Sequence, residues 1–103
     1  MTAIPENEWP ESLVKVSEKV ANFNSTPLNE HGDLQSVPRL GEVTETNLKA
    51  AECDTVKKLI GMYLFKGSTQ PNLQAWLEGI EIRPQEARPV SIVIHNYCAA
   101  QDL

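Results

Sequence analysis

Apolar residues recur every three or four positions from Glu11 onward, the spacing that places them on one face of an α-helix. Glu11 and Lys15 lie four residues apart, where an ion pair forms on the exposed side of a helix. The segment 24–27 ends the pattern, because the residue before Pro27 is pushed out of the helical region. We therefore predict an amphipathic helix from Glu11 to Phe23 and then a polar loop over 28–36, with room for one helical turn. The apolar face of this predicted helix consists of Leu13, Val16, Val20 and Phe23.

Two further helices follow a tight turn over 37–41. The first is predicted to end near Glu52, and Asp54 suits the N-cap of the second. Gly67 is placed to end that second helix, because glycine readily adopts the left-handed conformation found after a helix end. The apolar positions are Val43, Leu48 and Ala51 in the first helix, and Val56, Leu59, Ile60, Tyr63 and Leu64 in the second.

A short fourth helix is predicted between Ser68 or Thr69, either of which suits its N-cap, and Gly79. Pro71 fits its first turn, where a missing N–H costs no helical hydrogen bond. Leu73, Trp76 and Leu77 form its inward face.

The last segment allows two interpretations. Pro84 suits the start of a helix, but Pro89 would interrupt it, and the run 90–94 is rich in β-branched residues that favour a strand. If the segment is helical, Pro89 fits best in the first turn, so a regular helix would run from Arg88 to Ala100.

Length and charge limit the classes of function. The chain has 103 residues, room for one domain, and 41% of them are hydrophobic. Its net charge is -5, whereas nonspecific DNA-binding proteins usually carry a basic surface. The negative charge is concentrated in residues 1–33, so any contact with nucleic acid must be local. In that segment the acidic residues are Glu6, Glu8, Glu11, Glu18, Glu30 and Asp33, against Lys15 and Lys19.

The N-terminal residues 1–10 contain two prolines and acidic side chains, which predicts a flexible tail with Trp9 docked on a helical domain over 11–103. The chain start has neither the basic nor the apolar region of a signal peptide, and no apolar run is long enough to span a membrane. We therefore expect a nuclear or cytosolic protein without membrane insertion.

Metal binding and catalysis have little support in the sequence. His31, Cys53, His95 and Cys98 are the candidate zinc ligands, but only His95 and Cys98 have ligand-like spacing, and structural zinc sites usually show two close pairs. The cysteines suit a reducing compartment without a disulfide. No triad or phosphate-binding loop is recognisable, so we expect no metal, no cofactor and no enzymatic activity.

Several short strings occur in the same order and at the same spacing as in a known family of small helical proteins. Over residues 19–103 the chain resembles the barrier-to-autointegration factor family, with no gap needed from Val37 to the end. The strings are Pro27 with Glu30; Ser36-Val37-Pro38-Arg39-Leu40-Gly41-Glu42-Val43; Leu48; Asp54; Leu59-Ile60-Gly61-Met62-Tyr63-Leu64; Trp76-Leu77; and Leu103.

The resemblance implies an all-α fold, a small compact bundle of about five short helices that contains a helix-hairpin-helix element. It also implies that the last segment is helical. A small helical interaction domain of the sterile-alpha-motif kind is the alternative if the resemblance is fortuitous.

The resemblance further implies a homodimer that binds one DNA duplex per subunit without sequence specificity and bridges them. The implied DNA contacts are Lys19, Arg39, Gly41 and Val43. A hairpin of this type exposes backbone N–H groups at the start of the next helix, where the helix dipole also attracts a phosphate.

The chain departs from the family at four positions that contact DNA in the family. Arg39 replaces the first hairpin glycine and adopts positive φ less easily. Asn47 replaces a lysine, and Glu86 and Pro89 replace two basic residues, which removes three phosphate contacts. Arg88, with Arg83, lies close enough in sequence to compensate in part.

The family dimerises through the third helix, which assigns Gly61, Met62, Tyr63 and Leu64 to a dimer interface with a second copy or a family paralogue. From its place on the apolar stripe, however, Tyr63, like Trp76, is better explained as part of the core. Family dimers also bind LEM-domain proteins of the inner nuclear envelope. Here 65–68 and Asn72 depart from that groove, which argues against such a partner.

Two hypotheses follow. In the first, the chain is a nonspecific double-stranded DNA-binding and bridging homodimer that acts in chromatin or nuclear organisation. Alternatively, it is a protein-interaction module that keeps the dimer but has lost most DNA contacts.

Overall fold

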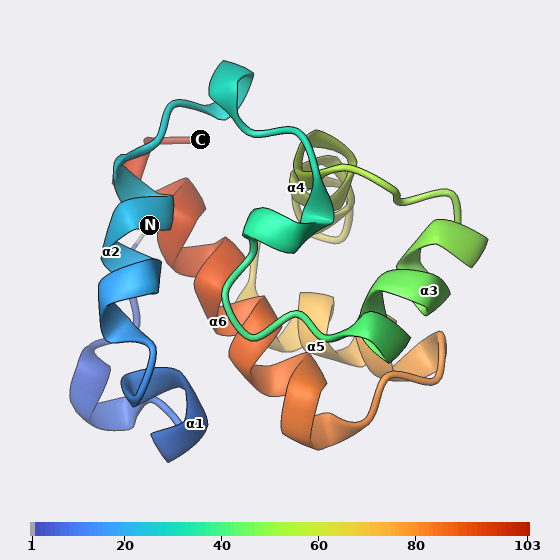
Figure 1. The fold of residues 1–103 in the computed structure, drawn as a ribbon, viewed down its shortest axis with the longest axis horizontal. Helices are drawn as coiled ribbons and strands as arrows, with labels where there is room; N and C mark the ends of the chain where they lie inside the picture. Colours follow the sequence, from blue (N-terminus) through green and yellow to red (C-terminus); the bar gives the residue numbers. More distant parts are fainter. Residues whose placement is uncertain (1) are drawn as a thin grey trace.

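The computed structural model describes residues 2–103, and these are all-helical, with no β-strand among them. This confirms the predicted all-α class, although the long first helix is divided and three short 3-10 helices are added. Figure 1 shows the arrangement. The α-helices are α1 (Glu11–Val14), α2 (Ser17–Ser25), α3 (Glu42–Ala50), α4 (Val56–Phe65), α5 (Gln70–Gly79) and α6 (Pro84–Ala100), and the 3-10 helices are η1 (Glu6–Glu8), η2 (Leu28–Glu30) and η3 (Leu34–Ser36).

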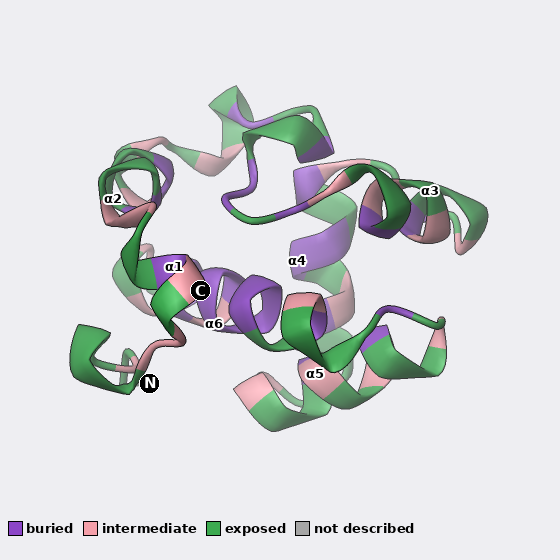
Figure 2. Ribbon diagram, turned by 60° about the horizontal axis from the view of Figure 1, so that its bottom comes forward, coloured by how far each residue is buried: buried purple, intermediate pink, exposed green. Residues whose placement is uncertain are grey.

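Helix α6 is the centre of the molecule (Figure 1). It packs against α2, α4 and α5, and its residues 89–94 are all buried. The β-branched run that alone favoured a strand is therefore helical, because burial on several sides at once outweighs its local preference. In Figure 2 the buried residues concentrate on α6 and on the inner side of α4.

The predicted helix from Glu11 to Phe23 is broken at Val16, which leaves the helical region with φ -117° and ψ 29°. The break lets α1 bury Leu13 while α2 buries Val20 and Phe23 in the same core. The predicted ion pair between Glu11 and Lys15 forms at 3.8 Å.

Four of the α-helices end in the same way. The residue two positions after the last helical residue has positive φ, and its N–H and the next N–H bond back to carbonyls of the last turn, which is the Schellman motif. Gly67 takes this place after α4, as predicted, with φ +105°. The other helices use non-glycine residues there, at a steric cost of about 1 kcal/mol each: Glu52 after α3, Glu81 after α5 and Asp102 after α6.

The N-cap of α4 was predicted one residue too early. Thr55, not Asp54, caps the helix, and its side-chain oxygen accepts a hydrogen bond from the Lys58 N–H at 3.2 Å. Asp54 instead pairs with the Lys58 ammonium at 2.9 Å, and this bond lowers the pKa of the Asp54 carboxyl. Thr69 caps α5 as expected, and Pro71 lies in its first turn.

Helix α6 begins four residues earlier than predicted, at Pro84, and continues through Pro89. Pro89 cannot donate the usual hydrogen bond to the carbonyl four residues before it. Pro89, Ala87 and Val90 are buried, so packing offsets the missing bond. The added first turn carries Glu86 toward the start of α3.

The predicted flexible tail over 1–10 contacts α6 through Thr2, Ile4 and Glu8; Met1 lies outside the described residues. The Ile4 N–H donates to the Asn96 side chain at 2.8 Å, and the Asn96 amide donates to the Ile4 carbonyl at 3.0 Å. The Trp9 indole N–H also donates to the Ile4 carbonyl, at 2.9 Å. Trp9 packs against the core, as expected.

Within residues 2–103, no helix has the length and apolar character needed to cross a bilayer.

Candidate nucleic-acid interface

A tight turn over Val37–Leu40 leads into α3. The Leu40 N–H bonds to the Val37 carbonyl at 3.3 Å, with Pro38 in the second position and Arg39 in the third. Arg39 has φ +66°, and a third turn residue with positive φ after proline is typical of a type II turn, where glycine is preferred. The turn therefore keeps a glycine-like backbone at Arg39, with a strain of about 1 kcal/mol, and directs a guanidinium to the surface.

Next to this turn lies a pocket of about 510 Å³, which we call the α3 pocket. Lys19 of α2, Arg39 and Gly41 line it, so the structure brings together three of the five predicted DNA-binding residues. Lys19 and Arg39 are exposed. The ion pairs among residues 2–103 involve neither of them, so both cations are available to an anion from solution.

A carboxylate of the chain itself also lies in the α3 pocket. Glu86 accepts a hydrogen bond from the hydroxyl of Thr44, a completely buried residue in the first turn of α3. A methyl group built on Gly41 would lie only 3.1 Å from Glu86 Oε1. The carboxylate therefore lies at the N-terminus of α3, on the side where the helix dipole favours negative charge.

The other two predicted contacts lie outside the α3 pocket. Val43 is 70% exposed and lines a neighbouring hollow with Arg83 and Glu81. The Arg88 guanidinium donates to the Glu8 carbonyl at 3.2 Å. Arg88 therefore holds the N-terminal segment, and the lining of the α3 pocket does not include it.

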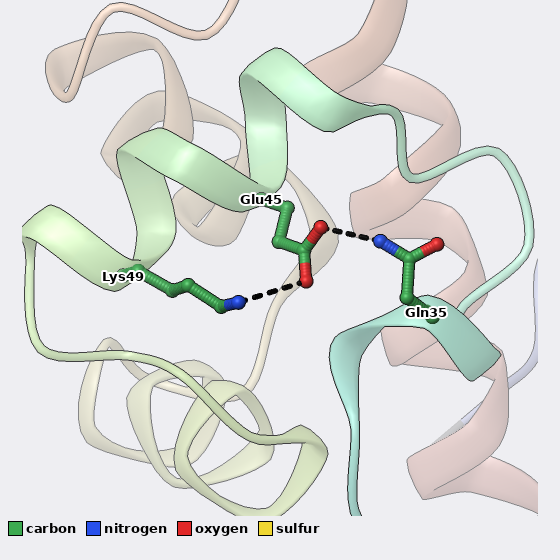
Figure 3. Close-up of polar contacts among 3 residues, drawn as sticks. All are labelled: Gln35, Glu45 and Lys49. Atoms are coloured by element: carbon green, nitrogen blue, oxygen red, sulfur yellow. Dashed lines mark hydrogen bonds and ion pairs between the residues drawn. The ribbon is translucent and has the colours of Figure 1, made fainter.

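Polar contacts fix the wall of the α3 pocket. In Figure 3 the Glu45 carboxylate of α3 accepts a hydrogen bond from the Gln35 amide of η3. It also forms an ion pair with the Lys49 ammonium at 3.1 Å. On the other side, buried His31 contacts the Phe23 carbonyl through Nε2 at 3.1 Å, and its ring packs on Phe23 and Tyr97. These contacts join the loop before α3 to α2 and α6.

Asn47, where the resemblance implied a basic residue, has a structural partner. Its amide donates to the Ile80 carbonyl at 3.2 Å, at the end of α5. The position therefore joins α3 to the α5–α6 connection and offers no cation to a phosphate.

No family model and no curated protein matches the chain. The resemblance to the barrier-to-autointegration factor family therefore stays a prediction, as does the helix-hairpin-helix assignment of the turn and α3. The geometry provides a pocket with one internal carboxylate and two cations that have no ion-pair partner among residues 2–103.

Helix α4 contains the four residues predicted at a dimer interface. Gly61 and Leu64 are exposed and Met62 is half-buried, whereas Tyr63 is completely buried. Burial raises the Tyr63 pKa to about 12, and its hydroxyl lies 2.7 Å from His95 Nδ1. Tyr63 is therefore a core residue, as its place on the apolar stripe indicated, and its side chain is not presented to a partner.

The sequence interpretation did not assign Phe65, the last residue of α4, to the interface. Phe65 is 80% exposed, and the Lys66 ammonium lies 5.7 Å from its ring centroid. We call the exposed or half-buried set Gly61, Met62, Leu64 and Phe65 the α4 face. Phe65 does not share the helical spacing of the apolar residues of α4 that pack inside the chain. This spacing is the sequence signal that marks Phe65 as outward-facing.

Metal-ligating side chains do not gather within residues 2–103: no group of three His, Cys, Asp or Glu is placed to hold an ion. Both cysteines are buried. Burial raises the pKa of Cys53 to about 11 and that of Cys98 to about 12, so both are neutral thiols at physiological pH.

Proposed function

We propose that the protein is a non-enzymatic, nonspecific double-stranded DNA-binding protein that engages the phosphate backbone at the α3 pocket. The observation that carries the proposal is the meeting of Lys19, Arg39 and Gly41 around one pocket at the start of α3. Contacts of this kind position DNA without reading its sequence. A role in chromatin or nuclear organisation, as in the family that the chain resembles, belongs to the same proposal.

The physical basis is a combination of cations and a helix start. Gly41 is the N-cap of α3 and has no side chain to cover the first N–H groups of the helix. A phosphate oxygen therefore finds backbone donors and a favourable dipole there, with Lys19 and Arg39 beside it. Two cations predict a modest salt dependence, about tenfold weaker binding between about 50 and 200 mM salt.

Bridging requires two DNA sites per particle, and we propose that the α4 face supplies the dimer contact. A side chain added at Gly61 would meet nothing within 4 Å, so the helix surface is open there. Leu64 and Phe65 extend this surface with exposed apolar area. Burying them against a second copy removes that area from water and gives a homodimer with one α3 pocket on each subunit.

The test is a fluorescence anisotropy titration of a short labelled duplex at low and physiological salt. Lys19→Ala is expected to weaken binding about tenfold and to reduce the slope of the salt dependence by about one. Lys57→Ala is the matched control, since it removes an exposed cation of α4 that lies outside the α3 pocket and that the ion pairs among residues 2–103 do not include. Gly41→Glu adds a carboxylate at the helix start and is expected to abolish binding. Absence of wild-type binding at low salt contradicts the proposal, as does equal weakening by Lys57→Ala.

The alternative function is a protein-interaction module that keeps the dimer without DNA contact. Glu86 inside the α3 pocket and the exposed Phe65 favour it. This alternative predicts that the α4 face mediates self-association or pairing with a related chain while the duplex titration stays flat at every salt concentration.

A further inference from the structure

We infer that Glu86 is an internal competitor of phosphate: its carboxylate occupies the anion position at the start of α3, and a phosphate enters only when this side chain moves out. The inference deepens the proposed function and rests on it for its consequence in DNA binding. It assigns to Glu86 a regulatory contact that sets how strongly the α3 pocket binds an anion.

The position of the carboxylate supports competition. Glu86 Oε1 lies 3.1 Å from the place where a Gly41 Cβ would be, and Oε2 accepts the Thr44 hydroxyl. Gly41 and Thr44 are the N-cap and the third residue of α3, the positions from which a helix start holds an anion. A phosphate oxygen and the Glu86 carboxylate cannot both fill this space.

The way Glu86 is held indicates that it can be displaced. The ion pairs among residues 2–103 do not include it, so Lys19 and Arg39 do not hold it in the pocket. The Thr44 hydroxyl holds it, and its side chain is half-buried with a path to solvent. Displacement therefore exchanges one hydrogen bond for contacts with an incoming phosphate.

Charge gives the contact its effect. With Glu86 in place the α3 pocket contains two cations and one carboxylate, and with Glu86 neutral it contains two cations alone. An anion entering the pocket therefore meets repulsion from Glu86 that is stronger in this partly desolvated site than in water.

A structural tie between α6 and α3 is the competing explanation, and an isosteric variant separates the two. Glu86→Gln keeps an oxygen that can accept the Thr44 hydroxyl but removes the charge. Thr44→Val removes the hydroxyl and leaves the charge free to move away. The matched control is Glu78→Gln, which removes an exposed carboxylate of α5 outside the α3 pocket.

The experiment is an amide NMR titration of wild type and these variants with inorganic phosphate, followed by the duplex titration on the same samples. Glu86→Gln is expected to bind phosphate about fivefold or more tightly than wild type, with shifts at the amides of Glu42, Val43 and Thr44. Thr44→Val should change in the same direction by less, and Glu78→Gln should match wild type.

Equal phosphate affinity in wild type, Glu86→Gln and Thr44→Val overturns the inference, as do shifts confined to other residues or the absence of phosphate binding in every variant. The proposed function fails separately. If Glu86→Gln gains phosphate affinity at α3 but no protein binds duplex, the competitor is real and the DNA proposal is wrong. If duplex binds wild type and Glu86→Gln equally, DNA binding stands and the competitor role is wrong.

Discussion

The α3 pocket and the α4 face differ in how far residues of the same chain already make the contacts that a ligand or partner would make. The pocket presents a helix start and two cations that the ion pairs among residues 2–103 do not include, and Glu86 already supplies one carboxylate there. The α4 face presents Leu64 and Phe65 to solvent, and the neighbouring Lys66 ammonium lies 5.7 Å from the Phe65 ring centroid. The chain itself therefore balances part of the charge of the pocket, whereas it leaves Leu64 and Phe65 exposed.

This difference implies an order of strengths. Burial of apolar area has no internal competitor at the α4 face, so self-association should tolerate salt. Anion binding at the α3 pocket must displace Glu86 and compete with salt. We therefore expect changes at the α4 face to have larger effects than changes at the α3 pocket.

The largest effect is expected from Gly61→Glu, which places a charge in the centre of the α4 face. Burying an unpaired charge in an interface costs about 3 kcal/mol or more, so dimer affinity should fall at least a hundredfold. Sizing chromatography over a range of concentrations measures it. Gly79→Glu is the control, because its added side chain also meets nothing within 4 Å. Unchanged elution of Gly61→Glu would place any dimer contact elsewhere.

The core that supports both surfaces has its own pH signature. Cys53 and Cys98 ionise in the unfolded chain near pH 9.0, but burial raises their folded pKa values to about 11 and about 12. The unfolding free energy should therefore fall as pH rises above about 9, by up to about 1.4 kcal/mol per pH unit for each thiol. Denaturant titrations at several alkaline pH values measure this slope. A double Cys→Ala variant should show a smaller slope, and an equal slope would contradict the assignment.

At the α3 pocket, Arg39→Gly separates charge from backbone. Glycine suits the positive φ of this position, so stability should change by less than about 1 kcal/mol. Loss of the guanidinium should weaken duplex binding about tenfold. Arg39→Lys restores the charge and should restore most of the affinity in the same anisotropy titration. A glycine variant that binds duplex as well as wild type would show that Arg39 serves the turn alone.

The smallest effect is expected from Glu52→Gly, which relieves positive φ at the end of α3 outside the α3 pocket. The variant should gain about 0.5 to 1 kcal/mol of stability and leave duplex binding unchanged. Thermal unfolding and the duplex titration together measure the result. A loss of stability would show that the Glu52 side chain contributes more than its backbone strain costs.

Periodicity predicted most of the helices, because the apolar stripes of α2, α4 and α5 are local signals, whereas the all-α class followed from the family resemblance, which made the last segment helical. Periodicity could not predict the break at Val16 or the helical path through Pro89. Both depend on how distant residues pack: α1 and α2 share one core, and α6 is surrounded by α2, α4 and α5. Local sequence also could not decide between Asp54 and Thr55 as the N-cap of α4, since both residue types suit this position.

The candidate site was predictable in part. The string around Gly41 and the lysine at position 19 indicated an anion site, and the structure places them at one pocket. The contact of Glu86 with Thr44 joins residues 42 positions apart. Sequence reasoning therefore predicted the loss of a basic residue at position 86 but not the place of the carboxylate at the helix start. Arg88 was expected to compensate in part because it lies close in sequence to the lost basic positions. Its contact with the Glu8 carbonyl depends on the docking of the N-terminal segment, which local sequence does not reveal.

The central claim, that the α3 pocket is where DNA binds, is tested most directly by an amide NMR titration of the wild-type protein with a short duplex at low salt. We expect the changes to concentrate at Lys19 and at residues 39–44, while the amides of the α4 face keep their positions. Changes centred on Gly61 to Phe65, or no change anywhere at low salt, would contradict it.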